Sequence, residues 1–314
     1  MGSWVKIGAS QDAGLAQTGC KLPVIIFSHG IGGFQNAYST LLTELASWGF
    51  VVLAMEHADG TASAVQLPNG RFKGYGGWPL KEEGRLAQTR YRAQECENAV
   101  GLLKGLSLGS PAPGLRLGSR YASSPVASFK GRLDMDCCAI LGHSFGGATA
   151  GLLAAQDPAF HCAICLDPWW PALLPECPTL VAWQTSTPIL IMGSQDWNNQ
   201  DKPEGFFAAG AERQKAILRA AKRARQQLSG SHSAEQHARA PGSSHHSFHD
   251  VLALFSTYFK SILKTVGFQS VLEPFHGLRL IRRQRLAAGG VQDDDKGLYR
   301  QLVGPDAIFI LETS

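Results

Sequence analysis

The sequence predicts an α/β protein in which helices cover both faces of a mostly parallel sheet. Short unbroken apolar runs, typical of strands buried on both faces, occur at residues 24–27, 50–55 and 137–141. Segments with helical spacing lie between and after these runs. Buried strands that alternate with helices are typical of a parallel sheet.

The elements are assigned in order from local pattern. Strands are placed where apolar residues run without a break, and helices where apolar residues recur at helical spacing, as at 36–48, where Gly49 ends the helix. Residues 58–82 are glycine-rich and are expected to form a long loop that walls a site. The remaining expected elements are a helix at 83–105, a surface segment at 106–133, a helix at 145–156, strands at 161–166 and 188–192, a basic helix at 204–228, and a helix from 247 to 263.

Composition describes an ordinary globular protein. The chain has 314 residues, 44% of them hydrophobic and 17% charged, enough for an ample core. A net charge of +4 is small for this length and implies no nucleic-acid-binding surface. No apolar run is long enough to cross a bilayer, and the N-terminus shows no signal-peptide pattern. The seven cysteines lack the rhythm of a disulfide framework, so we expect a reducing compartment, the cytoplasm.

One domain is expected, flanked by two simpler ends. Residues 1–22 show no periodicity and are interpreted as an arm, and residues 265–314 as a peripheral tail. The alternating pattern fills residues 23–264. Within it, residues 229–244 are polar, so any strand there would be weak.

The stretch ILGHSFGGATAGLLAA, residues 140–155, places a Gly-x-Ser-x-Gly motif between a buried strand and a helix. This is the context of a nucleophile elbow, a strained turn that exposes a serine Oγ at the positive end of a helix. Small residues, Gly142 and Gly146, flank Ser144, as such a turn requires. A phosphate-binding loop is disfavoured because no Gly-Lys-Ser/Thr follows. Ser144 is thus the candidate nucleophile, with simple small-residue packing as the alternative.

A serine nucleophile needs a base and an acid that orients the base, in the chain order Ser, acid, His. Two candidate acids follow predicted strands, Asp167 in CLDPWW and Asp196 in IMGSQDW. Candidate bases are the histidines of GSSHHSFH at 242–249, in a loop just before a helix.

An oxyanion hole needs two backbone N–H groups aimed at the developing charge. We expect one from Phe145, the residue after the serine. The loop HGIGG at 29–33 follows an early strand, and its glycines let amides turn toward the pocket, so Ile31 is the expected second donor. A simple tight turn is the alternative interpretation of this loop.

Metal sites are not indicated. Cys162 and Cys165 are three residues apart on an expected strand and therefore face opposite sides. His245 and His249 have helical spacing, but the glutamate of the zinc-protease pattern is missing.

Four stretches resemble the platelet-activating factor acetylhydrolases of plasma type and intracellular type II. They are PVIIFSHGIGGFQNAYSTLLTELASWGFVVLAMEHADGTAS, TRYRAQEC, CCAILGHSFGGATA and CLDPWW. A family pattern of Gly-Ser-x-His, then Phe and Asp, is met by GSSH at 242–245 with Phe248 and Asp250. The likeness spans roughly residues 23–260 and implies the α/β-hydrolase fold.

The resemblance implies a calcium-independent group VII phospholipase A2, a serine esterase that hydrolyses short or oxidised sn-2 acyl groups of phospholipids through an acyl-enzyme. It implies no metal or organic cofactor. Ser144 would be the nucleophile, His245 the base and Asp167 the acid, because this family places the acid directly before a Trp-containing segment. Ile31 and Phe145 would supply the oxyanion amides.

The sequence departs from the family pattern in several places. Only a short segment precedes the first strand, so the sheet is expected to lack the family's first strands. Polar sequence, SAEQHARAPGSS, replaces the strand expected before His245. Glu56-His57-Ala58-Asp59 lacks a charge common in the family. Asp196 follows the strand where many other α/β-hydrolases hold their acid, although Asp167 is preferred.

A phospholipid is therefore the expected partner. Tyr75, Trp78, Trp169 and Trp170 are interpreted as exposed apolar residues that contact a lipid surface or wall a pocket. The nearest rival function is a general carboxylesterase or polyester-type hydrolase on the same fold. A non-catalytic scaffold is the second rival, suggested by the short N-terminus and the polar segment before His245.

Overall fold

The computed structural model describes most of the first 173 residues and shorter parts of the rest of the chain. The described residues are 9, 13, 15–16, 19–47, 49–67, 69–77, 82–110, 129–173, 187 and 189–194, together with the backbone of 236–240 and 309–312. The expected helices at 204–228 and 247–263 lie outside these ranges.

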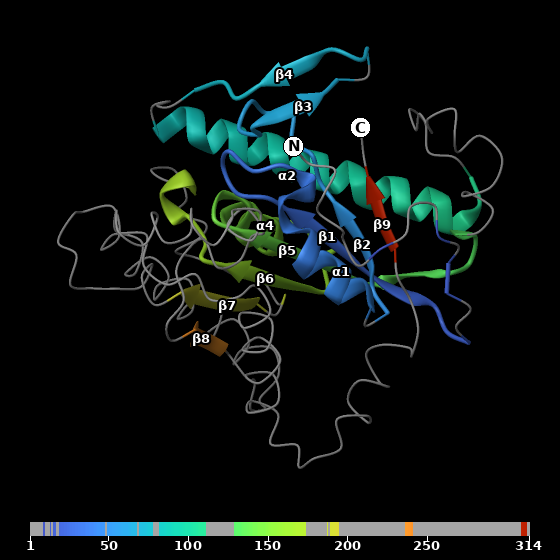
Figure 1. Cartoon of the computed structure of the whole chain (residues 1–314). Coiled ribbons are helices and arrows are strands. Elements are labelled where there is room, and N and C mark those ends of the chain that lie inside the picture. The colour runs from blue at the N-terminus through green and yellow to red at the C-terminus, as the bar shows by residue number, and fades with distance from the viewer. Residues whose placement is uncertain are drawn as a thin grey trace, which may run out of the picture.

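The described residues form a seven-stranded sheet in the order β8-β7-β6-β5-β1-β2-β9, and every neighbouring pair is parallel (Figure 1). This confirms the predicted α/β class with a parallel sheet. The strands are β1 (Leu22–Ser28), β2 (Val51–Ala54), β5 (Leu133–His143), β6 (Cys162–Leu166), β7 (Ile189–Ser194), β8 (Gln236–Ala240) and β9 (Phe309–Glu312).

Helices of the described part pack on both faces of this sheet. Val24 and Ile26 of β1 lie in an apolar layer with α2 (Glu82–Leu108) and α4 (Phe145–Gln156). Ile25 and Phe27 point the other way, into a layer with α1 (Ser39–Ser47), because successive side chains of a strand face opposite sides. Figure 1 shows α2 and α4 on one side of the sheet and α1 on the other.

The order of the strands creates a switch point between β1 and β5. From β1 the chain moves to β2 on one side, and after α2 it returns to β5 on the other side of β1. Loops that leave the carboxyl ends of two such strands diverge, and ligands of open α/β sheets bind in the crevice between them. Residues 29–33 follow β1 and Ser144 follows β5, so both candidate elements lie at this point.

The segment at 58–82 was expected to be a loop, but it contains an antiparallel hairpin of β3 (Ala64–Gln66) and β4 (Phe72–Gly74). Each strand has three residues, and only Val65 among them is buried. Such short, exposed strands carry no apolar pattern for a sequence-based prediction to detect. The helix expected at 36–48 also begins differently, with the 3₁₀ turn η2 (Gln35–Tyr38) before α1.

The polar segment before His245 contains a short strand, where the sequence indicated a weak one at most. β8 pairs with β7 in parallel register from Leu190 opposite Gln236 to Ser194 opposite Ala240. β8 lies at the end of the strand order, and an edge strand needs no continuous apolar run. At the other edge, β9 pairs with β2, so residues 309–312 of the expected tail belong to the sheet.

Two of the expected surface aromatics are core residues. Trp169 and Trp170 are 6% and 1% exposed and lie in the larger apolar layer, so contact of these two residues with a lipid surface is wrong, whereas their alternative role as pocket walls stays a prediction. Trp170 is part of the 3₁₀ turn η4 (Trp170–Leu173). Tyr75 is exposed, whereas Trp78 lies outside the described residues.

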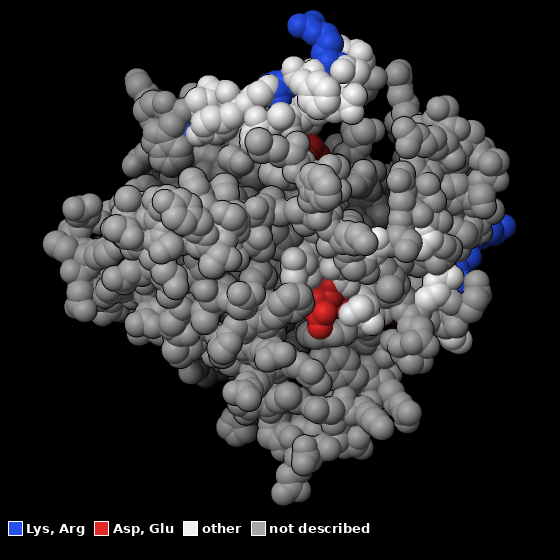
Figure 2. Space-filling view, in the orientation of Figure 1, with Lys and Arg blue, Asp and Glu red and all other residues white. Residues whose placement is uncertain are grey.

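Charges are scattered on the face of the described part that Figure 2 shows. The visible Lys and Arg side chains stand apart from one another near the rim of the view, and they form no single cationic area there. Among the helices of the described residues, none has both the length and the hydropathy that a membrane span requires.

Candidate active site

Ser144 lies on a strained turn between β5 and α4. Its φ of 57° and ψ of −115° are rare for a residue with a side chain, and such strain is kept where the surrounding structure enforces it. A Cβ added to Gly142 would lie 2.0 Å from the Gly146 carbonyl oxygen, and one added to Gly146 would lie 2.0 Å from the Ser28 carbonyl oxygen. Packing therefore dictates both glycines of the motif. This is the strand–turn–helix geometry that the motif predicts.

Backbone hydrogen bonds hold this turn against the neighbouring strand. The Ser144 N–H donates to the Leu166 carbonyl at 2.9 Å, and the Ser144 carbonyl accepts from the Trp169 N–H at 2.8 Å. Ser144 is 6% exposed. The end of β6 and the segment that follows it therefore hold the serine through both polar groups of its backbone.

Asp167 directly follows β6, and in the sequence it lies between Leu166 and Trp169, the two residues that bond to the Ser144 backbone. Its side chain is fully buried, and its N–H donates to the Met192 carbonyl of β7 at 2.7 Å. A φ of 40° turns the backbone sharply away from the strand direction. The structure thus brings one candidate acid beside Ser144 at the carboxyl edge of the sheet. Asp196 and His245 lie outside the described residues, so the base and the choice of acid stay predictions.

The loop after β1 lies against Ser144. A Cβ added to Gly30 would stand 3.2 Å from the Ser144 Cβ. The Gly30 N–H donates to the Tyr38 hydroxyl at 3.0 Å, and that hydroxyl lies 2.8 Å from Nδ1 of His143, the residue before the serine. Tyr38 therefore fastens the loop to the elbow. This role was not predicted, because the helical pattern around Tyr38 carries no sign of a function for its hydroxyl.

The Ile31 N–H has no hydrogen-bond acceptor among the described residues, unlike its neighbours in the loop. The Gly32 N–H donates to the Thr61 carbonyl at 2.7 Å, and the Gly33 N–H donates to the Gly30 carbonyl at 3.1 Å. The Gly30 N–H is bonded to the Tyr38 hydroxyl, as described above. Within residues 30–33, the Ile31 N–H is therefore the one amide that has no acceptor among the described residues. An unpaired amide in this loop is what an oxyanion donor requires.

Phe145, directly after Ser144, carries a second amide without an acceptor among the described residues. The first intrahelical bond of α4 runs from the Ala148 N–H to the Ser144 carbonyl, so the Phe145 N–H precedes it and has no acceptor among the described residues. The positive end of the helix dipole lies at this same point. The two predicted oxyanion donors thus lie on elements that flank the serine.

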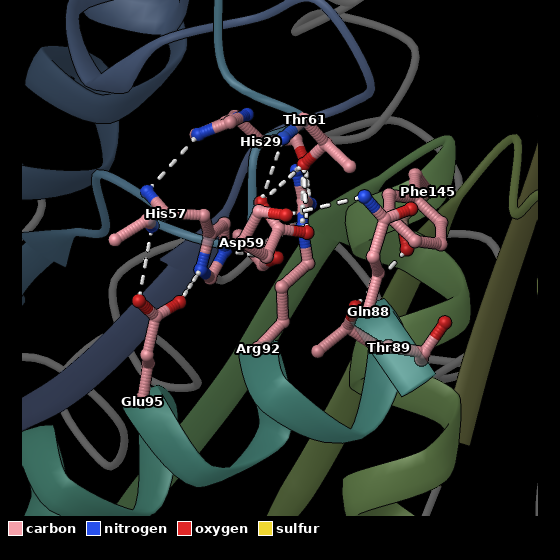
Figure 3. Close-up of polar contacts among 12 residues, drawn as sticks. His29, His57, Asp59, Thr61, Gln88, Thr89, Arg92, Glu95 and Phe145 are labelled. Atoms are coloured by element: carbon pink, nitrogen blue, oxygen red, sulfur yellow. Dashed lines mark hydrogen bonds and ion pairs between the residues drawn. The ribbon is translucent and has the colours of Figure 1, made fainter. Parts of the chain in front are cut away.

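A buried polar network lies next to the loop after β1, and Figure 3 shows its members His57 and Glu95 beside His29 of the loop. Ser28 Oγ lies 2.8 Å from His57 Nε2, and His57 Nδ1 lies 2.6 Å from Glu95 Oε2. This Ser–His–carboxylate order is that of a catalytic relay, but Ser28 and His57 are fully buried. Ser28 also lies within strand β1, whereas Ser144 lies on the strained turn of the Gly-x-Ser-x-Gly motif, so Ser144 is the better candidate.

Burial sets the charge state of this network. It lowers the pKa of His57 well below its ordinary value and raises the pKa of Glu95 to about 7. Burial also lowers the pKa of His29, whose Nδ1 pairs with the Gly30 carbonyl at 2.7 Å. Both histidines are therefore neutral at pH 7, where His29 Nδ1–H can donate to the loop carbonyl.

The cysteines of the expected strand face opposite sides, as predicted. Cys165 is buried in the larger apolar layer, whereas Cys162 packs against the other one. No group of three or more metal-binding side chains occurs among the described residues.

Comparison with known proteins identifies the relatives of this chain. The family model of platelet-activating factor acetylhydrolase, isoform II, matches residues 3–299. The platelet-activating factor acetylhydrolase of Cavia porcellus is 39% identical over 174 residues, which cover 52% of this chain and 39% of the relative. That of Bos taurus is 39% identical over 169 residues, 49% of this chain and 36% of its own length.

A third relative is more distant. The platelet-activating factor acetylhydrolase of Gallus gallus is 32% identical over 196 residues, 56% of this chain and 45% of its own length. The matches thus span less than half the length of each of these curated relatives. Because the family model matches nearly the whole chain, the chain belongs to the platelet-activating factor acetylhydrolase isoform II family.

Proposed function

We propose that this chain is a serine esterase that hydrolyses short or oxidised sn-2 acyl groups of phospholipids, with 1-alkyl-2-acetylglycerophosphocholine as the type substrate. The observation that carries the proposal is the strained Ser144, next to a loop and a helix start whose Ile31 and Phe145 amides have no acceptor among the described residues. Its relatives are named platelet-activating factor acetylhydrolases, which supports the phospholipid class.

In the proposed mechanism, Ser144 Oγ attacks the sn-2 ester carbonyl while His245 accepts the serine proton. Asp167 holds the imidazole in the required tautomer and stabilises the imidazolium. The Ile31 and Phe145 amides donate to the oxyanion, and electrostatic stabilisation of this kind is the largest single contribution in many enzymes.

Collapse of the tetrahedral intermediate breaks the ester bond and leaves an acyl group on Ser144. The departing lysophospholipid alkoxide takes the proton from His245. A water molecule, deprotonated by the same histidine, then attacks the acyl-enzyme, which releases the free acid and returns the proton to Ser144.

The cytoplasm is the compartment we propose. Cys137, in the described part of the chain, is a free thiol, and it is exposed. Exposed free thiols are typical of a reducing environment.

Substrate preference tests the proposal against its rivals. Purified protein and Ser144→Ala are assayed on phosphatidylcholines with acetyl or long sn-2 chains and on p-nitrophenyl esters. We expect hydrolysis of the acetyl phospholipid, little of the long-chain one, and none by the variant. Equal rates on lipids and simple esters, whatever the head group, would support a general carboxylesterase instead. A folded protein inactive on every ester would be the non-catalytic scaffold.

A further inference from the structure

Arg92 of α2 is a buried cation in the middle of an apolar helix face. Its side chain is fully buried, and it shares this face with Thr89, Cys96 and Leu103, spaced as one side of a helix. A buried guanidinium needs charged and hydrogen-bonding partners to offset its desolvation. Those partners show what the arginine holds in place.

Each of these partners lies near the loop after β1 (Figure 3). Arg92 Nη1 donates to the His29 carbonyl at 2.5 Å, and Nε donates to Asp59 Oδ2 at 2.9 Å. Nη2 donates to the Thr61 hydroxyl, which itself donates to Asp59. The Asp59 side chain is 1% exposed, so its carboxylate balances the guanidinium with little solvent screening.

Through these contacts Arg92 fixes the backbone on both sides of Ile31. On one side it binds the His29 carbonyl directly. On the other side it binds Thr61, whose own carbonyl accepts the Gly32 N–H at 2.7 Å. The Ile31 amide therefore lies between two points that one guanidinium controls.

Arg92 also contacts the second half of the proposed oxyanion hole. Its guanidinium carbon lies 4.5 Å from the centroid of the Phe145 ring, within the range of a cation–π contact. Phe145 carries the other open amide, at the start of α4. Arg92 thus contacts both the His29 carbonyl, which precedes the Ile31 amide in the chain, and Phe145, which bears the second amide.

We propose that Arg92 is a positioning residue that sets the Ile31 and Phe145 amides at one fixed separation across Ser144. This inference rests on the proposed function, because it takes those two amides as the oxyanion donors. The planar guanidinium is required, because its N–H groups donate to His29, Asp59 and Thr61 while its face lies over the Phe145 ring. A lysine ammonium could keep the charge beside Asp59 but could not span all of these partners.

Two variants and one control test the inference. Arg92→Met removes the charge and the hydrogen bonds, and Arg92→Lys keeps the charge, which protects folding if the first variant is unstable. Arg132→Met is the matched control, because Arg132 also donates to a backbone carbonyl, that of Ala16 at 2.7 Å, but precedes β5 at the opposite edge of the sheet.

Hydrogen–deuterium exchange gives a readout that needs no activity. We expect both Arg92 variants to exchange faster than wild type in peptides covering residues 29–33 and 145, by about tenfold. Arg132→Met should exchange there at the wild-type rate. With p-nitrophenyl acetate, we expect kcat of the Arg92 variants to fall by about 10²-fold while KM changes about twofold or less.

The outcomes separate the two proposals. A folded Arg92→Lys with wild-type exchange and wild-type kcat would overturn the positioning role while leaving the esterase in place. An equal loss of kcat in Arg132→Met would also overturn the positioning role, because the loss of an arginine far from the loop would then lower kcat just as much. Faster loop exchange in a protein that hydrolyses no ester would support the positioning of the loop and refute the proposed function.

Discussion

Gly146→Ala tests whether backbone packing dictates the elbow sequence. The new Cβ would lie 2.0 Å from the Ser28 carbonyl oxygen and 2.5 Å from the Ser28 carbonyl carbon, whereas real Cβ contacts below 3.0 Å are essentially absent. Both atoms belong to the backbone of β1, where Ser28 is in register with Gly142 of β5. Either β1 or α4 must therefore move by about 1 Å, and overpacking costs about 1–3 kcal/mol, with the upper end expected for a contact with backbone atoms. We also expect kcat to fall by about 10²-fold, because Ser144 moves with α4.

Gly101→Ala provides the matched control in the same protein. Gly101 lies in α2, and nothing stands within 4 Å of its added Cβ. The same substitution should therefore stabilise the protein by about 0.5–1 kcal/mol through helix propensity. Urea unfolding followed by circular dichroism measures both variants, and equal slopes against urea allow their free energies to be compared. Wild-type stability of Gly146→Ala, or a destabilised Gly101→Ala, would refute the reasoning.

Two further predictions concern buried polar groups. Tyr38→Phe leaves the Gly30 N–H without its acceptor, so the free energy of unfolding in urea should fall by about 1–3 kcal/mol. We also expect kcat to fall about tenfold. An unchanged free energy of unfolding would contradict the role of the hydroxyl. Because the pKa of Glu95 rises from 4.5 to about 7 on folding, the folded protein binds more protons than the unfolded chain between these values. The unfolding free energy of wild type minus that of Glu95→Gln should therefore decrease as the pH rises from about 4.5 to about 7, and parallel curves would contradict the shift.

Much of the fold is determined by local pattern. β1, β2, β6 and β7 are unbroken apolar runs because strands in the middle of a covered parallel sheet are buried on both faces. The Ser144 elbow was equally predictable, since steric contact demands glycine at two fixed positions around the serine. Short-range physics determines both features, so a single sequence reveals them.

Other features depend on partners distant in the sequence. β8 pairs on one side only and carries the polar residues QHARA, so its pattern resembled a loop. Arg92 lies 33 residues from Asp59 and 63 from His29, and nothing local indicates that these groups meet. The one available signal was a charged residue on the apolar stripe of α2, which implies a buried partner. The burial of Trp169 and Trp170 could not be predicted either, because it depends on how the chain turns after β6.

The central claim is that Ser144 is an activated nucleophile, and stoichiometric labelling tests it most directly. Folded protein is treated with a fluorophosphonate probe, digested, and analysed by mass spectrometry beside Ser144→Ala. We predict one adduct per chain, on Ser144, and none on the variant. A folded wild-type protein that leaves Ser144 unlabelled, or labelling that persists in Ser144→Ala, would contradict the claim.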